Sequence, residues 1–333
     1  MIRIQKLKVS GLSFRPNEVS GEIFLRFLDF ARNDTGEDMN ILITGGSGFI
    51  GQNLVEGLKN EYKIFVPSHS ELEIMDSVAV RKYIKKNKIK VVIHTAVKGG
   101  DQILENILRM FMSIYNNIDL LDKFINFGSG AEYAKTRDLK KVKETELGKF
   151  IPTDNYGLGK LICSQLAKDN KKIVTILPFG IFGPGEDYRF KFIANSIVKN
   201  LLNLPIKIKQ NVIFDYLYIK DLVPIIKFFL KSDKYHGDFN ISTTESISLK
   251  EIVEIINKVG KFKSKISIDK KNYNYQYTGS NQKLKKTIPH LKITSYEDSI
   301  KDFSNYLKGN LETIDKDAII QDEYFKKSKI KTS

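Results

Sequence analysis

The stretch NILITGGSGFIGQNLVEGL, residues 40–58, decides the fold. An apolar run ends there in four glycines within seven positions, and a pattern typical of an amphipathic helix follows. Glycines at 45, 48 and 51 allow a tight turn, a close approach to the backbone and free N–H groups at a helix N-terminus. A dinucleotide pyrophosphate needs these three properties, so the stretch predicts a nucleotide-binding strand, turn and helix. The alternative is a structural turn that binds no ligand.

Beyond this stretch, short β-like runs alternate with helical patterns. This alternation predicts an α/β fold, with a Rossmann-type, doubly wound parallel sheet that carries helices on both faces. The expected strands cover residues 41–44, 63–66, 91–94, 124–127 and 173–177, and the expected helices cover 48–60, 77–86, 103–123 and 155–168.

After Pro178 the alternation loosens. A helix is predicted again from Ser248, because SLKE has the spacing of a capping box between Ser248 and Glu251. We therefore expect a smaller C-terminal α/β lobe that binds substrate. The predicted domains are a Rossmann domain of residues 39–180 with about 212–242, and a lobe of residues 181–211 and 243–333.

Residues 1–38 differ in composition from the rest. They contain four of the eight arginines but only two of the 46 lysines, and Met39 then precedes the first expected strand. We interpret them as a poorly ordered extension or a misassigned start. The alternative is a helix around 22–32 that docks on the body.

The net charge of +15 comes almost entirely from lysine spread through surface-like patterns, without an RNA-binding signature. We therefore expect no nucleic-acid partner. No apolar run approaches the roughly 20 residues of a membrane span, so we expect a cytoplasmic protein without membrane contact. The lone Cys163 and four scattered histidines give no disulfide and no metal-ligand spacing, so we expect no metal.

The end of the second strand bears on the choice between NADP and NAD. Domains that bind NAD usually place a carboxylate there to bind the ribose 2′-hydroxyl, whereas this chain has Ser68 and His69. Neutral donors tolerate a 2′-phosphate, which favours NADP while leaving NAD possible. Ser68 and His69 could also simply begin a loop. Asp76 is either a contact to the adenine or the cap of the next helix.

Tyr156 and Lys160 share one face of the helix NYGLGKLICSQLAK because they are four residues apart. A neighbouring ammonium stabilises a phenolate, so the pair predicts a tyrosine that exchanges a proton with a sugar hydroxyl. Chance accounts for about two such pairs, and a second one, Tyr216 with Lys220, lies in a strand-like pattern. Ser129 follows the strand 124–127, at the strand end where ligands of open α/β sheets bind.

Seven motifs together resemble an extended short-chain dehydrogenase/reductase of the nucleotide-sugar epimerase/dehydratase group. They are TGGSGFIG, VVIHTAV, FGSGAEY, NYGLGK, LPFGIFGPG, DYLYIKDL and FNIS followed by SLKEIVEII. The stretch 66–100 is most similar to GDP-L-fucose synthase-like reductases. The resemblance implies a bound NAD(P), a substrate that is a GDP-, dTDP-, UDP- or CDP-linked sugar, and a homodimer.

The resemblance also implies the residues of the site. Catalysis would rest on Ser129, Tyr156 and Lys160. Implied cofactor contacts are Gly45, Gly48, Phe49, Ile50, Gly51, Thr95, Ala96, Val97, Pro178 and Ile181, together with Tyr156 and Lys160. Implied substrate contacts are Lys98, Ser129, Gly130, Ala131 and Arg189.

Departures from the group narrow the chemistry. Fucose synthases carry a cysteine and a histidine where this chain has Ala131 and Arg189, and dehydratases carry Asp-Glu where it has Gly130 and Ala131. Without a second acid/base pair, the chemistry left to the chain is hydride transfer with a proton from Tyr156. The missing carboxylate at the end of the second strand favours a 4-keto-sugar reductase that uses NADPH over a 4-epimerase that retains NAD. Another class, a non-catalytic Rossmann binding or regulatory protein, is the further alternative.

The group often has an arginine where this chain has Phe214, so diphosphate binding would then rest on other cations. The candidates are Arg189, Lys191 and Lys199.

Overall fold

The structure, a computed structural model, describes residues 39–327, which belong to one compact unit. The expected extension, residues 1–38 with its alternative helix, lies outside the described residues. Within residues 39–327, no helix is long and apolar enough to cross a membrane.

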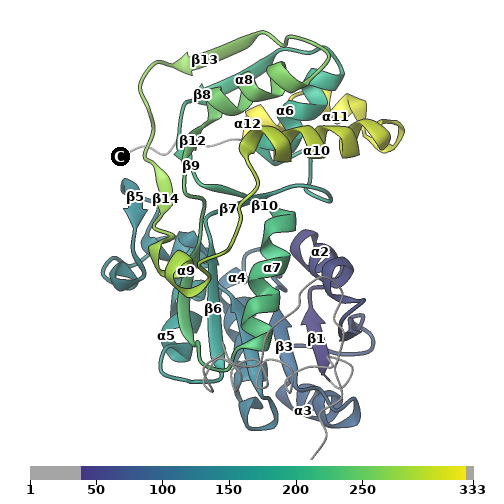
Figure 1. Ribbon diagram of the computed structural model, residues 1–333, viewed down its shortest axis with the longest axis vertical. Coiled ribbons are helices and arrows are strands. Elements are labelled where there is room, and N and C mark those ends of the chain that lie inside the picture. Colours follow the sequence, from purple (N-terminus) through teal and green to yellow (C-terminus); the bar gives the residue numbers. More distant parts are fainter. Residues whose placement is uncertain (1–38, 328–333) are drawn as a thin grey trace, which may run out of the picture. The chain divides into compact units, whose positions relative to one another are not determined.

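A six-stranded parallel sheet is the main sheet of the described chain (Figure 1). Its strand order is β11-β6-β4-β3-β1-β2, which confirms the predicted α/β fold with a parallel central sheet. Five of the strands come from residues 40–178, whereas the edge strand β11 comes from residues 237–241 and was not among the expected strands. The six strands are β1 (Asn40–Thr44), β2 (Lys63–Phe65), β3 (Val91–His94), β4 (Lys123–Phe127), β6 (Ile173–Pro178) and β11 (Gly237–Ile241).

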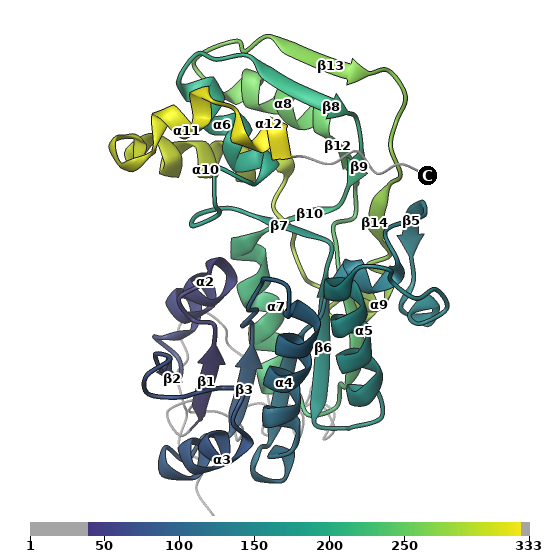
Figure 2. The same ribbon diagram turned by 180° about the vertical axis from the view of Figure 1, so that it is seen from behind.

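Helices cover both faces of this sheet because successive strand residues point to opposite sides. Ile41 and Ile43 of β1 belong to the core cluster shared with α2 and α7, whereas Leu42 packs with α3, α4 and α5. Figure 1 shows α7 in front of the sheet, and Figure 2, from behind, shows α4 and α5 side by side. These helices are α2 (Phe49–Leu58), α3 (Ser77–Lys86), α4 (Ile103–Tyr115), α5 (Asn155–Ala167) and α7 (Ile219–Lys231).

Helix α4 ends eight residues before the predicted end at 123. Asn116 caps it, and the Asn117 amide turns back to donate to the Ser113 carbonyl oxygen at 2.8 Å. A short 3₁₀ turn, Ile118–Leu120, then leads into β4, which already begins at Lys123. Two successive asparagines favour local hydrogen bonds to the backbone over a continued helix, which explains the early end.

Beyond the main sheet lie one four-stranded sheet, ordered β12-β9-β14-β5, and two strand pairs, β10-β7 and β13-β8. The Ser248 capping box is present in α8, as predicted. The strands are β5 (Leu139–Val142), β7 (Gly180–Phe182), β8 (Ile206–Gln210), β9 (Ile213–Phe214), β10 (Tyr216–Tyr218), β12 (Ile247–Ser248), β13 (Ile266–Lys270) and β14 (Tyr277–Gly279). The helices are α6 (Phe192–Leu201), α8 (Leu249–Val259), α9 (Gln282–Thr287), α10 (Tyr296–Gly309), α11 (Lys316–Ile320) and α12 (Glu323–Lys327).

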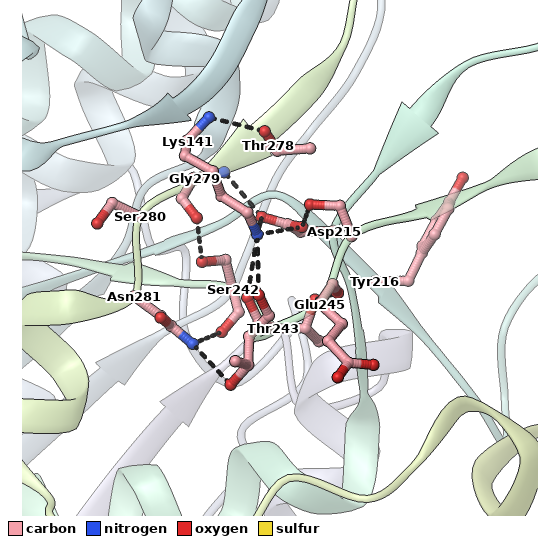
Figure 3. A network of polar contacts seen from close by, with 12 residues as sticks. Lys141, Asp215, Tyr216, Ser242, Thr243, Glu245, Thr278, Gly279, Ser280 and Asn281 are labelled. Carbon is pink, nitrogen blue, oxygen red and sulfur yellow. Dashed lines mark hydrogen bonds and ion pairs between the residues drawn. The ribbon is translucent and has the colours of Figure 1, made fainter.

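A buried carboxylate joins the parts of the four-stranded sheet (Figure 3). Asp215 is fully buried and accepts hydrogen bonds from Lys141 Nζ at 3.0 Å, Ser246 Oγ at 2.6 Å and Gly279 N at 2.9 Å. A buried charge is tolerated only when such partners satisfy it. The Asp215 carboxylate is therefore hydrogen-bonded to β5, to β14 and to the loop before β12 at the same time.

Candidate active site

The glycine-rich turn leaves no room for side chains. Gly45 has a φ of +72°, and a Cβ there would lie 2.7 Å from the backbone of Ala96. A Cβ at Gly51 would lie 2.2 Å from the Gly45 carbonyl oxygen. Gly48 is the N-cap of α2, and Phe49 and Ile50 form its half-buried first turn. Helix α2 therefore begins directly at the turn, with its free N–H groups at the strand end, a geometry that fits a pyrophosphate.

A cleft of 860 Å³ opens at this turn. It is large enough for a cofactor-sized ligand. The cofactor and substrate contacts predicted from the sequence that do not line the cleft are Phe49, Ile50, Gly51, Asp76, Ser129, Gly130, Ala131, Tyr156, Lys160, Pro178, Ile181 and Arg189. Those that line it are Gly45, Gly48, Ser68, His69, Thr95, Ala96, Val97 and Lys98.

The end of β2 holds a carboxylate that the sequence analysis did not place there. Glu71 folds back so that its Oε2 accepts hydrogen bonds from Ser68 N at 2.7 Å and Ser68 Oγ at 2.9 Å. Glu71 and Glu73 both line the cleft beside His69. The spacing Ser-x-x-Glu, which is that of a capping box, was the signal in the sequence that could have found this contact.

Asp76 does not line the cleft. Its side chain accepts hydrogen bonds from Val78 N at 2.8 Å and Ala79 N at 3.1 Å, which makes it the N-cap of α3. Of the two roles considered from the sequence, the structure shows capping.

Tyr156 and Ser129 are brought together by close packing of two segments. Asp154 caps α5 by accepting from Gly157 N at 2.9 Å. A Cβ at Gly157 would lie 2.8 Å from the Ala131 carbonyl oxygen, so only glycine lets α5 approach the turn after β4 this closely. As a result, the Tyr156 side chain lies close enough to the Ser129 hydroxyl for that hydroxyl to oppose the rise of the Tyr156 pKa that burial causes.

Lys160 lies one helical turn further along, and its side chain is buried at 3% exposure. Its Nζ donates to the carbonyl oxygen of Phe127 at 2.5 Å, at the carboxyl end of β4. On the neighbouring strand, the buried His94 Nδ1 is 2.7 Å from Thr44 Oγ1, and Thr44 lines the cleft. Burial and the nearby Lys160 lower the pKa of His94 to about 3, so His94 is neutral. Lys160 thus lies beside the inner end of the cleft.

The expected lowering of the Tyr156 pKa by Lys160 is not what the structure shows. Burial raises the pKa of Tyr156, and the nearby Ser129 hydroxyl is what opposes this rise. The ammonium of Lys160 is turned to Phe127 instead, and burial lowers its pKa. Ser129 is therefore the neighbour that stabilises the Tyr156 phenolate in this arrangement.

Glu132 supports Ser129 from behind. It is fully buried, and its Oε1 accepts from Ser129 N at 2.8 Å, while Ala131 N donates to Ser129 Oγ at 3.1 Å. The pKa of Glu132 is raised to about 8, because burial outweighs the stabilisation of its carboxylate by polar neighbours such as the Ser129 N–H. The Glu132 carboxyl therefore acts as a mostly neutral hydrogen-bonding group that fixes the turn carrying Ser129.

Gly130 and Ala131, two of the residues expected to contact substrate, are buried in the same turn, with Ala131 only 1% exposed. Pro178 ends β6, and Ile181 pairs with Leu217 of β10. Pro178 is therefore the last sheet residue of β6, Ile181 lies in the strand pair that follows, and neither residue lines the glycine-rich cleft.

The cations expected to bind a diphosphate are only partly free. Arg189 is exposed but binds Asp187 through two hydrogen bonds of 3.0 Å. Lys199 is buried and pairs with Asp322 at 2.5 Å, which rules it out as a surface cation. Lys191 precedes α6 and remains exposed.

Tyr277 is a site residue that the sequence analysis missed. It comes from β14, and Ser129 is near enough to its hydroxyl to oppose the rise of the Tyr277 pKa that burial causes. A Cβ on Gly130 would lie 2.8 Å from the Tyr277 hydroxyl, which places that hydroxyl against the turn. No local motif surrounds this residue, because its position depends on strand pairing across the four-stranded sheet.

Comparison with known proteins agrees with this geometry. The model of the "NAD dependent epimerase/dehydratase family" matches residues 41–242. The GDP-L-fucose synthase of Dictyostelium discoideum is 24% identical over 84% of this chain and 98% of its own length. The dTDP-4-dehydro-6-deoxyglucose reductase of Escherichia coli is 28% identical over 65% of this chain and 80% of its own length.

Among solved structures, a GDP-L-fucose synthetase from Naegleria fowleri bound to NADP superposes with a TM-score of 0.73 at 19% identity. The match covers 83% of this chain and 95% of that one. This likeness confirms the fold.

Proposed function

Since the chain belongs to the NAD dependent epimerase/dehydratase family, we propose that it reduces the C4 keto group of a nucleoside-diphosphate 4-keto-6-deoxy sugar with NAD(P)H. Tyr156 is the proton donor. The observation that carries the proposal is the close packing of α5 on the turn after β4, which brings Tyr156 and Ser129 together, because a Cβ at Gly157 would lie 2.8 Å from the Ala131 carbonyl oxygen. The names of two relatives, a GDP-L-fucose synthase and a 4-dehydro-6-deoxyglucose reductase, support the substrate class.

The residues of the cleft fit the implied cofactor. Its pyrophosphate would rest on the turn of Gly45, Gly48 and Gly51, because any Cβ at Gly45 or Gly51 would collide with backbone. Thr95 and Ala96 would line its inner end. When bound, the reduced nicotinamide supplies the hydride that a carbonyl carbon accepts.

The chain's own residues handle the proton. Tyr156 donates its phenolic proton to the oxygen at C4, which becomes a hydroxyl, and Ser129 donates to the phenolate that remains. Lys160 adds positive charge behind the pair, fixed by Phe127 O. A phenolate stabilised in this way is easier to form, which lowers the barrier to proton transfer.

Reduction is favoured over epimerisation at C3 and C5, which needs a second acid/base pair. The two family positions hold Ala131 and Arg189, and Ala131 is buried. Glu132 and Glu186, which could replace that pair in principle, are 0% and 7% exposed. Neither carboxyl is therefore open to a sugar in this structure.

One observation favours a second candidate, an NAD-dependent 4-epimerase. The Glu71 carboxylate lies beside Ser68 in the cleft, and a carboxylate there accepts a hydrogen bond from a ribose 2′-hydroxyl but repels a 2′-phosphate. We keep NADP as the proposed cofactor, supported by the NADP in the related Naegleria fowleri structure and by the His69 side chain in the same cleft.

The predicted division into a Rossmann domain and a substrate lobe, the base of the nucleotide (guanine, thymine, uracil or cytosine) and the homodimer stay proposals. A dimer through α4 and α5 would cover Leu166, which is 45% exposed on the outer side of α5. Sedimentation analysis of wild type and Leu166→Glu would test it, because a charge in that contact would give a monomer.

The test of the function is NADPH oxidation in the presence of GDP- and dTDP-4-keto-6-deoxyhexoses. Tyr156→Phe should abolish turnover, and Lys160→Met should reduce it at least about 100-fold. Lys220→Met is the matched control. Lys220 lies at the exposed start of α7 and pairs with Asp302 of α10, so this variant should leave the rate unchanged. Turnover that survives Tyr156→Phe contradicts the proposed role. NAD that stays bound through purification would point to the epimerase.

A further inference from the structure

The last described segment, residues 311–327, packs across α6 and β8, and we call it the C-terminal strap. It consists of a 3₁₀ turn, Leu311–Thr313, followed by α11 and α12. Figure 2 shows both short helices beside α6. Ile314 and Ile319 of the strap are 7% and 1% exposed and belong to the core cluster that includes α6. The strap is therefore a packed part of the protein.

A buried ion pair anchors the strap to α6. Lys199 Nζ lies 2.5 Å from Asp322 Oδ1, and the two side chains are 4% and 20% exposed. Phe192, the first residue of α6, packs against the Tyr324 ring with centroids 5.9 Å apart. A buried charge is tolerated only with its partner, so the pair strongly favours one position of the strap.

The strap also contacts the loop between β7 and α6, residues 183–191. Asp315 N of the strap donates to the Tyr188 hydroxyl at 2.9 Å. The Tyr188 carbonyl oxygen accepts from Asn195 Nδ2 of α6 at 3.0 Å. Tyr188 is thus held by the strap and by α6. The same loop carries Arg189, one of the residues expected to contact substrate.

The other end of this loop lies against the helix of the glycine-rich turn. Asn53 Nδ2 of α2 donates to the carbonyl oxygens of Pro184 and Phe49, both at 2.9 Å. A Cβ at Gly185 would lie 3.7 Å from the Phe49 ring. Phe49 belongs to the first turn of α2, whose free N–H groups would bind the cofactor pyrophosphate. The loop therefore lies directly beside the expected pyrophosphate site.

We propose that the strap holds the loop 183–191 against α2, with Tyr188 and Asp322 as positioning residues, and that release of the cofactor requires this loop to detach. Lys199 and Asp322 anchor the strap, the Asp315 N–H holds Tyr188, and the loop then closes on the first turn of α2. This inference rests on the proposed cofactor site and is independent of which sugar is reduced.

The variant Tyr188→Phe tests the contact between strap and loop, because it keeps the ring and removes only the hydroxyl that accepts from Asp315 N. Hydrogen exchange followed by mass spectrometry, without cofactor, should be about fivefold faster in the loop 183–191, the effect of one lost hydrogen bond. NADPH release, measured by stopped-flow fluorescence with excess NADP as the trap, should be faster by about the same factor.

Tyr296→Phe is the matched control. The Tyr296 hydroxyl also accepts from a backbone N–H, that of Tyr216, at 3.2 Å. Its other hydrogen bonds, with Thr243 Oγ1 and the Glu245 carbonyl oxygen, likewise lie outside the loop 183–191. This variant should leave loop exchange and NADPH release unchanged. Equal results for Tyr188→Phe and Tyr296→Phe overturn the proposal.

Asp322→Asn tests the anchor, because it leaves Lys199 buried without its partner. Exchange in the strap, residues 311–327, should be at least about 100-fold faster, and loop exchange and NADPH release should be faster as well. Adding Lys199→Met removes the unpaired charge and should bring all three rates back toward those of wild type. Asp302→Asn is the control, because Asp302 pairs with Lys220 and joins α10 to α7, away from the strap anchor.

The coupling is reciprocal, because each contact stabilises the other. In wild type, NADPH should slow exchange in the loop 183–191 and also in the strap. In Tyr188→Phe, NADPH should slow exchange in the loop much more than in the strap. Equal protection of the strap by NADPH in both proteins would contradict the proposed route through Tyr188.

Circular dichroism at the temperature of the measurements establishes which variants are folded. In folded Asp322→Asn, faster exchange confined to the strap, with unchanged NADPH release, would overturn the proposal, because the strap would then only stabilise its own surroundings. If Asp322→Asn failed to fold, the comparison of Tyr188→Phe with Tyr296→Phe would decide the role of the strap.

These measurements use no sugar substrate. Wild-type protein that binds NADPH but oxidises none with any 4-keto sugar would refute the proposed reaction, while exchange and release would still decide the role of the strap. Wild-type protein that binds no NADPH would refute the proposed cofactor site and this inference with it.

Discussion

The buried carboxyl of Glu132 makes stability depend on pH in a way that one isosteric substitution removes. Burial raises its pKa from 4.5 to about 8. The unfolded chain therefore releases this proton near pH 4.5, and the folded chain only near pH 8. The stability that this group contributes is complete below pH 4.5 and is lost as the pH rises toward 8.

The size of the effect follows from the two pKa values. A rise from 4.5 to about 8 corresponds to about 5 kcal/mol at about 1.4 kcal/mol per unit. Between pH 5 and pH 8, wild type should lose about 3 to 4 kcal/mol of unfolding free energy through this group. Glu132→Gln can still accept the Ser129 N–H and cannot ionise. Its stability should therefore rise relative to wild type by about 3 to 4 kcal/mol over the same interval.

Urea denaturation followed by circular dichroism, in steps from pH 5 to pH 8, measures this difference. Glu251→Gln is the matched control, because Glu251 occupies the same position in the capping box of α8. Hydrogen bonds from Ser248 lower the pKa of Glu251, so its variant should show no gain between pH 5 and pH 8. Parallel stability curves for wild type and Glu132→Gln would refute the reasoning.

Three further predictions follow from single contacts. Gly51→Ala would place a methyl group 2.2 Å from a backbone carbonyl oxygen, so fluorescence titration should show NADPH affinity reduced at least about tenfold. Glu186→Gln should gain stability with rising pH as Glu132→Gln does, because burial raises the pKa of Glu186 to about 8 as well. The same difference in urea midpoint between Glu186→Gln and wild type at pH 5 and at pH 8 would contradict this. Lys141→Met should lower the unfolding free energy by about 2 to 3 kcal/mol, because it leaves Asp215 buried without its cation. A double variant that combines Lys141→Met with Asp215→Asn should regain stability if the unpaired Asp215 carboxylate is the cause.

Much of the fold could be predicted because its signals are local. The glycine spacing, the apolar runs and the capping box at Ser248 each act within a few residues, and all correspond to elements of the structure. The helix 103–123 was predicted too long because its apolar pattern continues through Ile118 and Leu121, while two asparagines end the helix earlier. Strand β11 was not among the expected strands because GDFNI is short and begins with poor β-formers.

The candidate site divides in the same way. Ser129 and Tyr156 lie on neighbouring segments, and the sequence pattern predicted that they meet at one strand end, where the packing of Gly157 on Ala131 brings them together. Glu71 was missed because the carboxylate was expected at the strand end itself, whereas a turn brings this one back to Ser68. Tyr277 could not be found, because its place depends on pairing between segments far apart in the sequence.

This distant residue connects the geometry of the site to the stability of the second sheet. The Tyr277 hydroxyl lies against the turn that carries Ser129 only while β14 is paired with β5 and β9, and Tyr277 itself pairs with Leu139 and Phe214. Because the Asp215 network holds the same strand, a change that breaks this network should move the Tyr277 hydroxyl relative to that turn. The surroundings of Ser129 are then a property of the long-range pairing, and the local Tyr156 and Lys160 motif cannot by itself determine them.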